Sequence, residues 1–259
     1  MQKSQFVHIH PDAKIGKDVV IGPFVTIDKN VVIGDGCRIG SNVTILDGAR
    51  IGNNVTIFPG AVISAIPQDL KFKGEDTTAT IGDNTVIREC VTINRGTSSK
   101  GTTSVGKNCL IMAYCHVAHD CKVHDNVIMS NAVQLAGEVE VDDFAIIGGG
   151  TLVHQFCHLG AHIMIQGGAL INKDVPPFVK GAREPLSYTG VNSIGLRRRN
   201  FDSDKIREIQ DIYRYLYLSG LNVSDAVRAI RENVPQTPER DMILDFVESS
   251  KRGIIKGYV

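Results

Sequence analysis

The chain has 259 residues, and its 28 lysines and arginines balance 28 aspartates and glutamates. This neutral balance excludes a general attraction to polyanions, so we expect no nucleic-acid partner. No apolar run is long enough for a signal peptide or a membrane span. We therefore expect a cytoplasmic protein with no integral membrane segment.

An aliphatic residue recurs at every sixth position from Ile15 to Ile171. Of these 27 positions only three are polar, namely Asp69, Glu75 and Ser99. A helix needs an apolar stripe with a period near 3.6 and an ordinary strand alternates, so a period of six fits neither. The chain must turn every six residues, and short strands that stack about 4.8 Å apart form a parallel β-helix.

Two stretches interrupt this repeat, at residues 64–80 and 94–104, and together they contain all three polar exceptions. Loops expelled from a rigid scaffold are where binding residues concentrate. A tolerated insertion is the plainer explanation of such a loop. We nevertheless favour a binding role for Asp69 and Lys71 in the first stretch.

Most of the cysteines follow the repeat instead of a metal-binding spacing. They occupy the fifth place of a hexad, where neighbouring hexads carry valine or alanine, and are most simply small core residues. The sequence therefore favours neither a metal site nor a disulfide. The cysteines concerned are Cys37, Cys109, Cys115, Cys121 and Cys157.

Six of the eight histidines fall in the later coils, and none takes the first place of a hexad, so their side chains should point outward or lie at corners. His119 stands out because Asp120 follows it. A neutral imidazole is the side chain best suited to take a hydroxyl proton at neutral pH, and a carboxylate could orient it. If one coil has eighteen residues, His119, Gly137 and Gln155 stack in successive coils. A glycine beside the histidine could admit substrate and present its N–H to an oxyanion.

The repeat ends near Pro176 and Pro177, which divides the chain into a β-helical domain at residues 1–190 and a small helical domain at 191–259. Asp202 or Ser203 can cap a first helix that ends near Gly220. Residues 224–234 and 237–250 predict two more helices, the last with a threonine cap and a proline at its first position.

Hexads such as Ile-Gly-Asn-Asn-Val-Thr (51–56) resemble the hexapeptide-repeat transferases, which implies a left-handed triangular β-helix. The strings Ile-Pro-Gln-Asp-Leu-Lys-Phe (66–72), His-Val-Ala-His-Asp-Cys (116–121) and Val-His-Gln-Phe-Cys (153–157) are similar to the UDP-N-acetylglucosamine O-acyltransferases. The similarity runs over essentially the whole chain. Enzymes of this family begin lipid A synthesis by moving an (R)-3-hydroxyacyl group from acyl carrier protein to the glucosamine 3-hydroxyl of UDP-N-acetylglucosamine.

The resemblance implies that His119 is the general base, that Asp120 orients it, and that the Gly137 N–H stabilises the oxyanion, with no metal and no cofactor. It also implies a homotrimer with the cleft between subunits. Gly167 and Gly168 stand at the position that, in this family, limits how deep the acyl chain can reach. Their lack of a side chain favours a long acyl chain. The sugar, phosphates and nucleotide would be bound by Gln68, Asp69, Lys71, His116, Glu138, His154, Gln155, Asn192, Arg198 and Arg199.

Docking of the acidic acyl carrier protein would need a local basic cluster, because the chain is neutral overall. Arg197, Arg198 and Arg199 with Arg207 could supply it, together with Lys251, Arg252 and Lys256.

Three residues depart from the family pattern. Glu138 stands where a histidine is frequent, Asn94 replaces another histidine, and Ile194 replaces an acidic residue. These changes bear on sugar and uridine recognition and leave the proposed base in place.

Three other functions stay open on the sequence alone. A related N-acyltransferase shares the repeat but usually carries an N-terminal uridine-binding domain. A β-helical carbonic anhydrase would need three histidines that converge on zinc across a subunit boundary, for which His116, His119 and His124 are candidates. A purely structural or ligand-binding solenoid would leave His119 as a surface residue.

Overall fold

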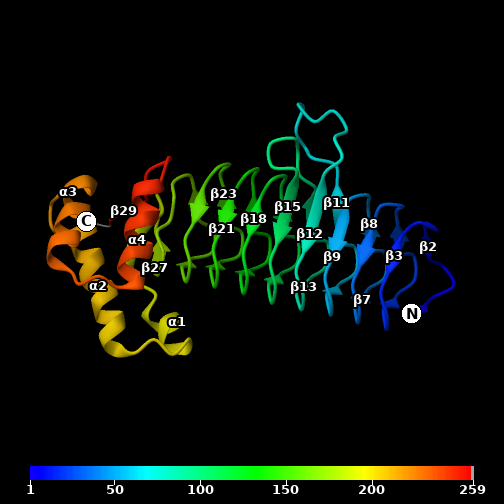
Figure 1. Cartoon of the computed structure of the whole chain (residues 1–259), viewed down its shortest axis with the longest axis horizontal. Helices are drawn as coiled ribbons and strands as arrows, with labels where there is room; N and C mark the ends of the chain where they lie inside the picture. Colours follow the sequence, from blue (N-terminus) through cyan, green and yellow to red (C-terminus); the bar gives the residue numbers. More distant parts are fainter. Residues whose placement is uncertain (258–259) are drawn as a thin grey trace.

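The computed structural model describes residues 1–257, which form a three-sided left-handed β-helix followed by a helical unit at its C-terminal end (Figure 1). Each coil contributes one short strand to each of three parallel sheets, as the sixfold repeat predicts. Ile21 pairs with Ile39, which pairs with Ile57, so one coil advances by 18 residues. The fold class expected from the sequence is confirmed.

The first sheet has twelve strands, and one of these is the antiparallel strand that leads to the helices. Its strands are β1 (Gln2–Lys3), β4 (Val20–Ile21), β7 (Arg38–Ile39), β10 (Thr56–Ile57), β13 (Val86–Ile87), β16 (Leu110–Ile111), β19 (Ile128–Met129), β22 (Ile146–Ile147), β25 (Met164–Ile165), β27 (Val179–Ala182), β28 (Ser187–Val191) and β29 (Lys256–Gly257).

The second sheet has nine strands and the third has eight. The nine are β2 (His8–Ile9), β5 (Thr26–Ile27), β8 (Thr44–Ile45), β11 (Val62–Ala65), β14 (Thr92–Asn94), β17 (His116–Val117), β20 (Gln134–Leu135), β23 (Leu152–Val153) and β26 (Leu170–Ile171). The eight are β3 (Lys14–Ile15), β6 (Val32–Ile33), β9 (Ala49–Ile51), β12 (Thr78–Ile81), β15 (Thr102–Val105), β18 (Lys122–Val123), β21 (Glu140–Val141) and β24 (His158–Leu159).

The core is built from the first and fifth residues of each hexad. Ile27 and Val43 are fully buried, and so is Met129 much later in the chain. The five cysteines at fifth places are also buried, as expected, whereas Cys90 is exposed. Since each coil buries two such side chains per face against its neighbours, hydrophobic burial stabilises the stack along its whole length.

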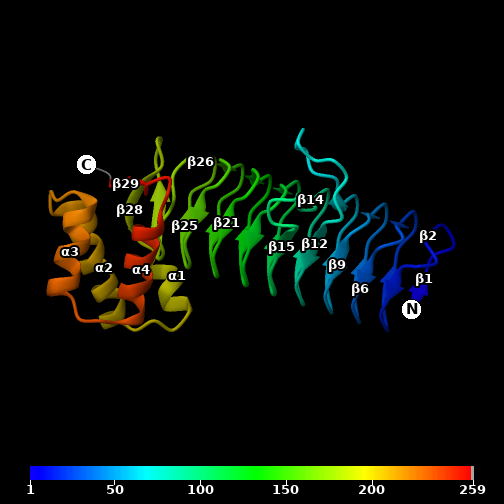
Figure 2. The same ribbon diagram turned by 45° about the horizontal axis from the view of Figure 1, so that its top comes forward.

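Both interruptions of the repeat are loops that leave the coil and return to it without disturbing the stack. Ile51 pairs with Ile81, 30 residues away, which is 12 more than one coil. Ile93 pairs with Val117, 24 residues away, which is 6 more than one coil. Because both excursions contain whole hexads, the aliphatic pattern keeps its phase through them. The loops project from one side of the solenoid (Figures 1 and 2).

Four helices follow the solenoid: α1 (Ser193–Arg198), α2 (Ser203–Leu218), α3 (Val223–Asn233) and α4 (Pro238–Ser249). The three longer helices confirm the sequence prediction, and the side chains of Asp202 and Thr237 cap α2 and α4 as expected. Helix α1 was not predicted, since its six residues contain a glycine and an arginine run. In residues 1–257 no helix has both the length and the apolar character needed to cross a bilayer.

The helices are attached to the last coils by buried contacts. Tyr213 of α2 is fully buried and donates a hydrogen bond to the carbonyl of Pro177. The ring of Phe246 in α4 packs on His158 of β24, with 4.5 Å between ring centroids. The helical unit therefore packs on the end of the solenoid opposite the N-terminus (Figure 1).

Candidate active site

One corner of the solenoid, where the nine-stranded sheet turns into the eight-stranded sheet, brings the proposed site together. His119 lies at this corner, between β17 and β18. Both expelled loops start and end at the same corner, since they join β11 to β12 and β14 to β15. The loops and the corner enclose a pocket of about 260 Å³. It is lined by Asp69, Lys71, Glu75, Thr97, Ser98, Ser99, His119 and Glu138.

His119 and Asp120 form a hydrogen-bonded pair, although they are adjacent in sequence. Asp120 has a left-handed backbone conformation with φ of 59°. Its carboxylate oxygen Oδ2 lies 2.9 Å from Nδ1 of His119. This geometry assigns the ring proton to Nδ1 and leaves the lone pair of Nε2 available. With 20% of its side chain exposed, His119 borders the pocket while Asp120 is fully buried.

The Asp120 carboxylate is held by the second loop. It accepts hydrogen bonds from the backbone N–H of Thr97 at 2.9 Å, the Thr97 hydroxyl at 2.6 Å and the backbone N–H of Lys100 at 3.2 Å. Burial opposes ionisation, but the hydrogen bonds from Thr97 and His119 outweigh it and keep the pKa of Asp120 below its ordinary value. The residue is therefore a carboxylate at neutral pH.

Thr97 and Lys100 were missed by sequence reasoning. The only signal for them was their place in a Gly-, Ser- and Thr-rich interruption of the repeat. Their contacts with Asp120 depend on the path of the loop, which the repeat does not specify.

Gly137 occupies the next coil directly beside the histidine. A Cβ atom at this position would lie 2.6 Å from Cε1 and 2.7 Å from Nε2 of the His119 ring. The backbone N–H of Gly137 makes no hydrogen bond to any acceptor in residues 1–257. The stacking of residues 119 and 137 agrees with the eighteen-residue coil, and the absence of a side chain keeps the imidazole accessible.

Glu138, one of the departures from the family pattern, connects this coil to the second loop. It lines the pocket and accepts a hydrogen bond from the Ser99 hydroxyl at 3.1 Å, and its other oxygen lies 3.9 Å from Nζ of Lys100. Asn94, a second departure, is buried and donates to the carbonyl of Ile66 at 2.9 Å. Both departures thus help to hold the loops that form the pocket.

Of the remaining candidates near the corner, Asp69 and Lys71 line the pocket, whereas Gln68 is exposed on the same loop. His116 projects from β17, and its Nδ1 lies 2.7 Å from the Thr92 hydroxyl. Burial, with a smaller contribution from the charge of His119, lowers the pKa of His116. His116 is therefore neutral at pH 7.

His154 and Gln155 lie at the same corner two coils further along, between β23 and β24. His154 lines a separate pocket with a basic rim. The other residues of this second pocket are Asn172, Lys173, Lys251 and Arg252.

The nucleotide-binding candidates are not brought to the His119 pocket within one chain. Asn192 is buried and caps α1, and its amide donates to the carbonyl of His162 at 2.9 Å. Arg199 donates to the carbonyl of Phe144 at 2.9 Å, and Arg198 is exposed. Ile194, the third departure, is 65% exposed on the same helix.

Gly167 and Gly168 lie at a different corner, between β25 and β26, where the twelve-stranded sheet turns into the nine-stranded one. The space beside Gly168 is open, since a Cβ atom added there would have no atom of the described residues within 4 Å outside its immediate chain neighbours. A single chain therefore does not place these glycines beside His119.

The histidines considered for zinc do not converge in one chain. Nδ1 of His119 is bound to Asp120, and His124 projects from the far edge of β18 toward Glu140. Among the described residues, His116 and His119 belong to no group with the spacing of metal ligands.

Three family models match separate parts of the chain. A model described as UDP-N-acetylglucosamine O-acyltransferase, domain 2, matches residues 174–255. Models of the bacterial transferase hexapeptide and of a GMPPB C-terminal domain match residues 102–137 and 4–67.

Relatives match over nearly the full length. The acyl-[acyl-carrier-protein]–UDP-N-acetylglucosamine O-acyltransferase of Alkalilimnicola ehrlichii is 49% identical over 249 residues, which are 96% of both chains. The protein of the same name from Thiobacillus denitrificans is 46% identical over the same share.

Solved structures of similar proteins have the same fold. A UDP-N-acetylglucosamine acyltransferase from Bacteroides fragilis superposes with a TM-score of 0.97 at 55% identity, covering 98% of this chain and 99% of that one. The Francisella novicida enzyme gives a TM-score of 0.95 at 40% identity over 98% and 94% of the two chains.

Proposed function

The chain belongs to the acyl-[acyl-carrier-protein]–UDP-N-acetylglucosamine O-acyltransferase family, and from this premise we propose how its own residues perform the reaction. The reaction moves an (R)-3-hydroxyacyl group from acyl carrier protein to the 3-hydroxyl of UDP-N-acetylglucosamine, the first step of lipid A biosynthesis. The observation that carries the mechanism is the Nδ1 of His119 bound to the buried Asp120 carboxylate, with Nε2 at the pocket.

His119 acts as the general base. Its Nε2 takes the proton of the sugar 3-hydroxyl while the sugar oxygen attacks the thioester carbonyl carbon, and the carbonyl oxygen becomes an oxyanion. The unpaired N–H of Gly137 is placed to stabilise that oxyanion. The C–S bond then breaks, and the imidazolium returns its proton to the departing thiolate. No acyl-enzyme is needed, and general base assistance supplies roughly 10² to 10⁴ in rate.

Asp120 fixes the tautomer and stabilises the imidazolium that forms during the reaction. Its carboxylate stays ionised because Thr97 and His119 donate hydrogen bonds to it. The second loop is therefore part of the catalytic apparatus, although none of its side chains reacts with substrate.

Asp69 and Lys71 bind the sugar and its phosphates from the first loop, with Gln68 and His116 beside them. Their presence in the His119 pocket supports this role for Asp69 and Lys71. Glu138 contributes a further carboxylate to the acceptor pocket.

The active enzyme is a homotrimer whose cleft lies between subunits. Two observations support this assembly. Within one chain, His119 lies away from Gly167, Gly168 and the arginines of α1. In addition, one outer face of the β-helix carries apolar side chains. The outer face of the twelve-stranded sheet carries a row of half-buried or exposed aliphatic side chains along its later strands, whereas the outer face of the eight-stranded sheet is polar except for Val32. The row consists of Val86, Leu110, Ile128, Ile146 and Met164.

In the trimer, a neighbouring subunit supplies the residues that one chain lacks near His119. Gly167 and Gly168 leave room for a long acyl chain, and Arg198 binds the nucleotide with Asn192 and Arg199 held in place beside it. His154 and Gln155 line the cleft further along the corner.

The basic rim around His154 is suited to the phosphate-bearing end of a substrate or to acidic acyl carrier protein. Lys173, Lys251 and Arg252 supply its positive charge. Arg207 is a weaker docking candidate, because it already pairs with Asp204 at 3.1 Å.

The base assignment is tested with His119→Ala and, as a matched control, His10→Ala at the exposed N-terminal end. The substrates are UDP-N-acetylglucosamine and 3-hydroxyacyl carrier proteins of graded chain length, with products read by mass spectrometry. His119→Ala should fold normally and lose at least about 10² in kcat, whereas the control keeps its rate. Turnover by His119→Ala within tenfold of the unchanged protein would refute the assignment.

A further inference from the structure

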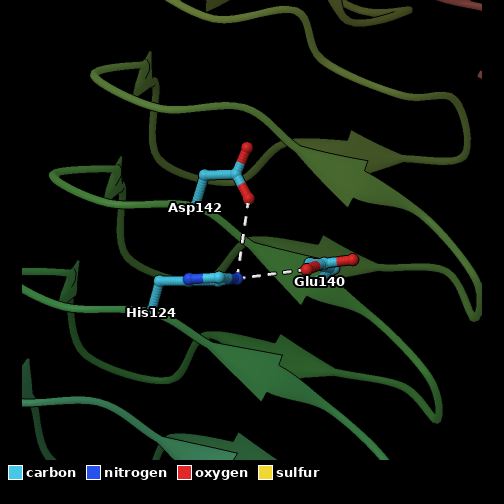
Figure 3. A group of neighbouring side chains, drawn as sticks. All are labelled: His124, Glu140 and Asp142. Carbon is cyan, nitrogen blue, oxygen red and sulfur yellow. Dashed lines mark hydrogen bonds and ion pairs between the residues drawn. The ribbon is translucent and has the colours of Figure 1, made fainter. Parts of the chain in front are cut away.

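A second cluster of reactive side chains lies on the polar outer face of the eight-stranded sheet. His124 follows β18, Glu140 lies in β21 and Asp142 follows β21, so the cluster joins two adjacent coils (Figure 3). His119 precedes β18 and His124 follows it. The cluster and the acyltransfer pocket therefore lie at opposite edges of this sheet.

We propose that His124, Glu140 and Asp142 form a zinc-binding site. Each offers one ligand atom, and the three ligand atoms lie within 4.8 Å of one another. Nε2 of His124 is 3.1 Å from Oε1 of Glu140 and 3.9 Å from Oδ1 of Asp142. Tetrahedral zinc with bonds of about 2.0–2.1 Å separates its ligand atoms by about 3.3 Å, between these two distances.

A fourth side chain lies beside the three ligands. Nε2 of His158, from the next coil, is 2.9 Å from the same Oδ1 atom of Asp142. The His158 ring is held in place by its contact with Phe246 of α4. Two imidazoles thus lie near the same Asp142 oxygen, and a water molecule can fill the fourth position of a tetrahedral ion held by the other three residues.

The donor chemistry selects the metal class. Imidazole nitrogen with carboxylate oxygen suits zinc and related transition ions, whereas magnesium and calcium prefer oxygen alone. All these residues are partly exposed, so an ion can enter from solvent. The backbone positions are fixed by the parallel ladder, in which Lys122 pairs with Glu140 and Glu140 with His158.

One residue competes with the metal. Nζ of Lys122 lies 3.2 Å from Oε1 of Glu140, and its side chain is 54% exposed. The ammonium group can move into solvent when zinc binds, but it lowers the affinity by occupying one ligand atom. Lys122→Met should therefore bind zinc more tightly than the unchanged chain.

The experiment is calorimetric titration of the full chain, without an affinity tag, with zinc chloride. It uses a Cys90→Ser background because Cys90 is the exposed thiol. Burial raises the pKa of Cys109 to about 11 and of Cys121 to about 12, which keeps these thiols protonated. We expect one zinc per chain, and a loss of at least about 100-fold in affinity for His124→Ala and for Asp142→Asn, because losing even an outer-shell partner costs 10–100-fold.

The matched control is His10→Ala, since His10 also lies near a carboxylate, with its Nδ1 3.7 Å from Asp12. This control should retain binding. The proposal is overturned if zinc does not saturate a single site, if His124→Ala and Asp142→Asn bind as before, or if His10→Ala or His119→Ala removes the ion. Circular dichroism of each variant distinguishes loss of ligand from loss of fold.

Discussion

His162 should make the protein less stable in mild acid, and replacing it with phenylalanine should remove that sensitivity. Its ring stacks between Phe144 and Phe178, with centroid distances of 4.9 and 5.5 Å, and Phe201 covers its edge at 5.3 Å. Nδ1 is buried with no hydrogen-bond partner in residues 1–257. Burial first, and then the nearby Arg199 charge, lowers the pKa of His162 to about 4.

The sign follows from proton binding. Between pH 6.5 and about 4 the unfolded chain binds a proton at this histidine and the folded chain does not. The free energy of unfolding therefore falls as the pH falls through this window. One pKa unit is worth about 1.4 kcal/mol, so the whole window costs about 3 kcal/mol.

Phe fits the site because both flanking phenylalanines adopt the same left-handed backbone, with φ of 59° at Phe144 and 66° at Phe178, against 60° at His162. Urea unfolding at fixed protein concentration, repeated from pH 4 to 7, measures the effect. The difference in unfolding free energy between His162→Phe and the unchanged chain should grow by about 3 kcal/mol as the pH falls. For an exposed control, His8→Phe, the plot of unfolding free energy against pH should run parallel to that of the unchanged chain. Parallel curves for His162→Phe would show that the buried ring is not the cause.

Two predictions concern the active site. Asp120→Asn should fold, because its amide oxygen can still accept from the Thr97 N–H and its amide NH₂ can donate to the Thr97 hydroxyl oxygen. The kcat should fall by roughly 10² to 10⁴ as the charge on His119 loses its partner; a loss below tenfold in steady-state assays contradicts this. Gly137→Ala would place a methyl group 2.6 Å from the His119 ring, so the ring must move. We expect at least about 10² lower kcat at an unchanged melting temperature, and normal kinetics would show that the ring has room.

The sequence predicted the scaffold well because one physical rule, burial of an aliphatic side chain at every sixth position, governs most of the chain. It also singled out His119 and Asp120 as a candidate pair. It could not show that their side chains meet, because that depends on the left-handed φ of Asp120. Thr97 was missed for a related reason: its contact with Asp120 is set by the loop, which does not follow the repeat.

Some residues assigned to the site by resemblance alone do not lie near His119 within one chain. Asn192 was expected to bind nucleotide, and in this chain its side chain caps α1 and binds the His162 carbonyl. Gly167 was expected at the acyl pocket, and within one chain it lies at another corner. Both proposed roles depend on the proposed trimer, because only a neighbouring subunit could bring these residues to His119.

The whole-hexad length of the two loops has a consequence for how such an enzyme can diversify. Their ends pair in the same ladder that would form without them, so their length and composition can change while the core keeps its contacts. His119 belongs to the regular coil, whereas Asp69, Lys71 and Thr97 belong to the exchangeable segments. Grafting a different loop should thus change the proposed acceptor contacts while the proposed base and the buried core of the β-helix stay in place.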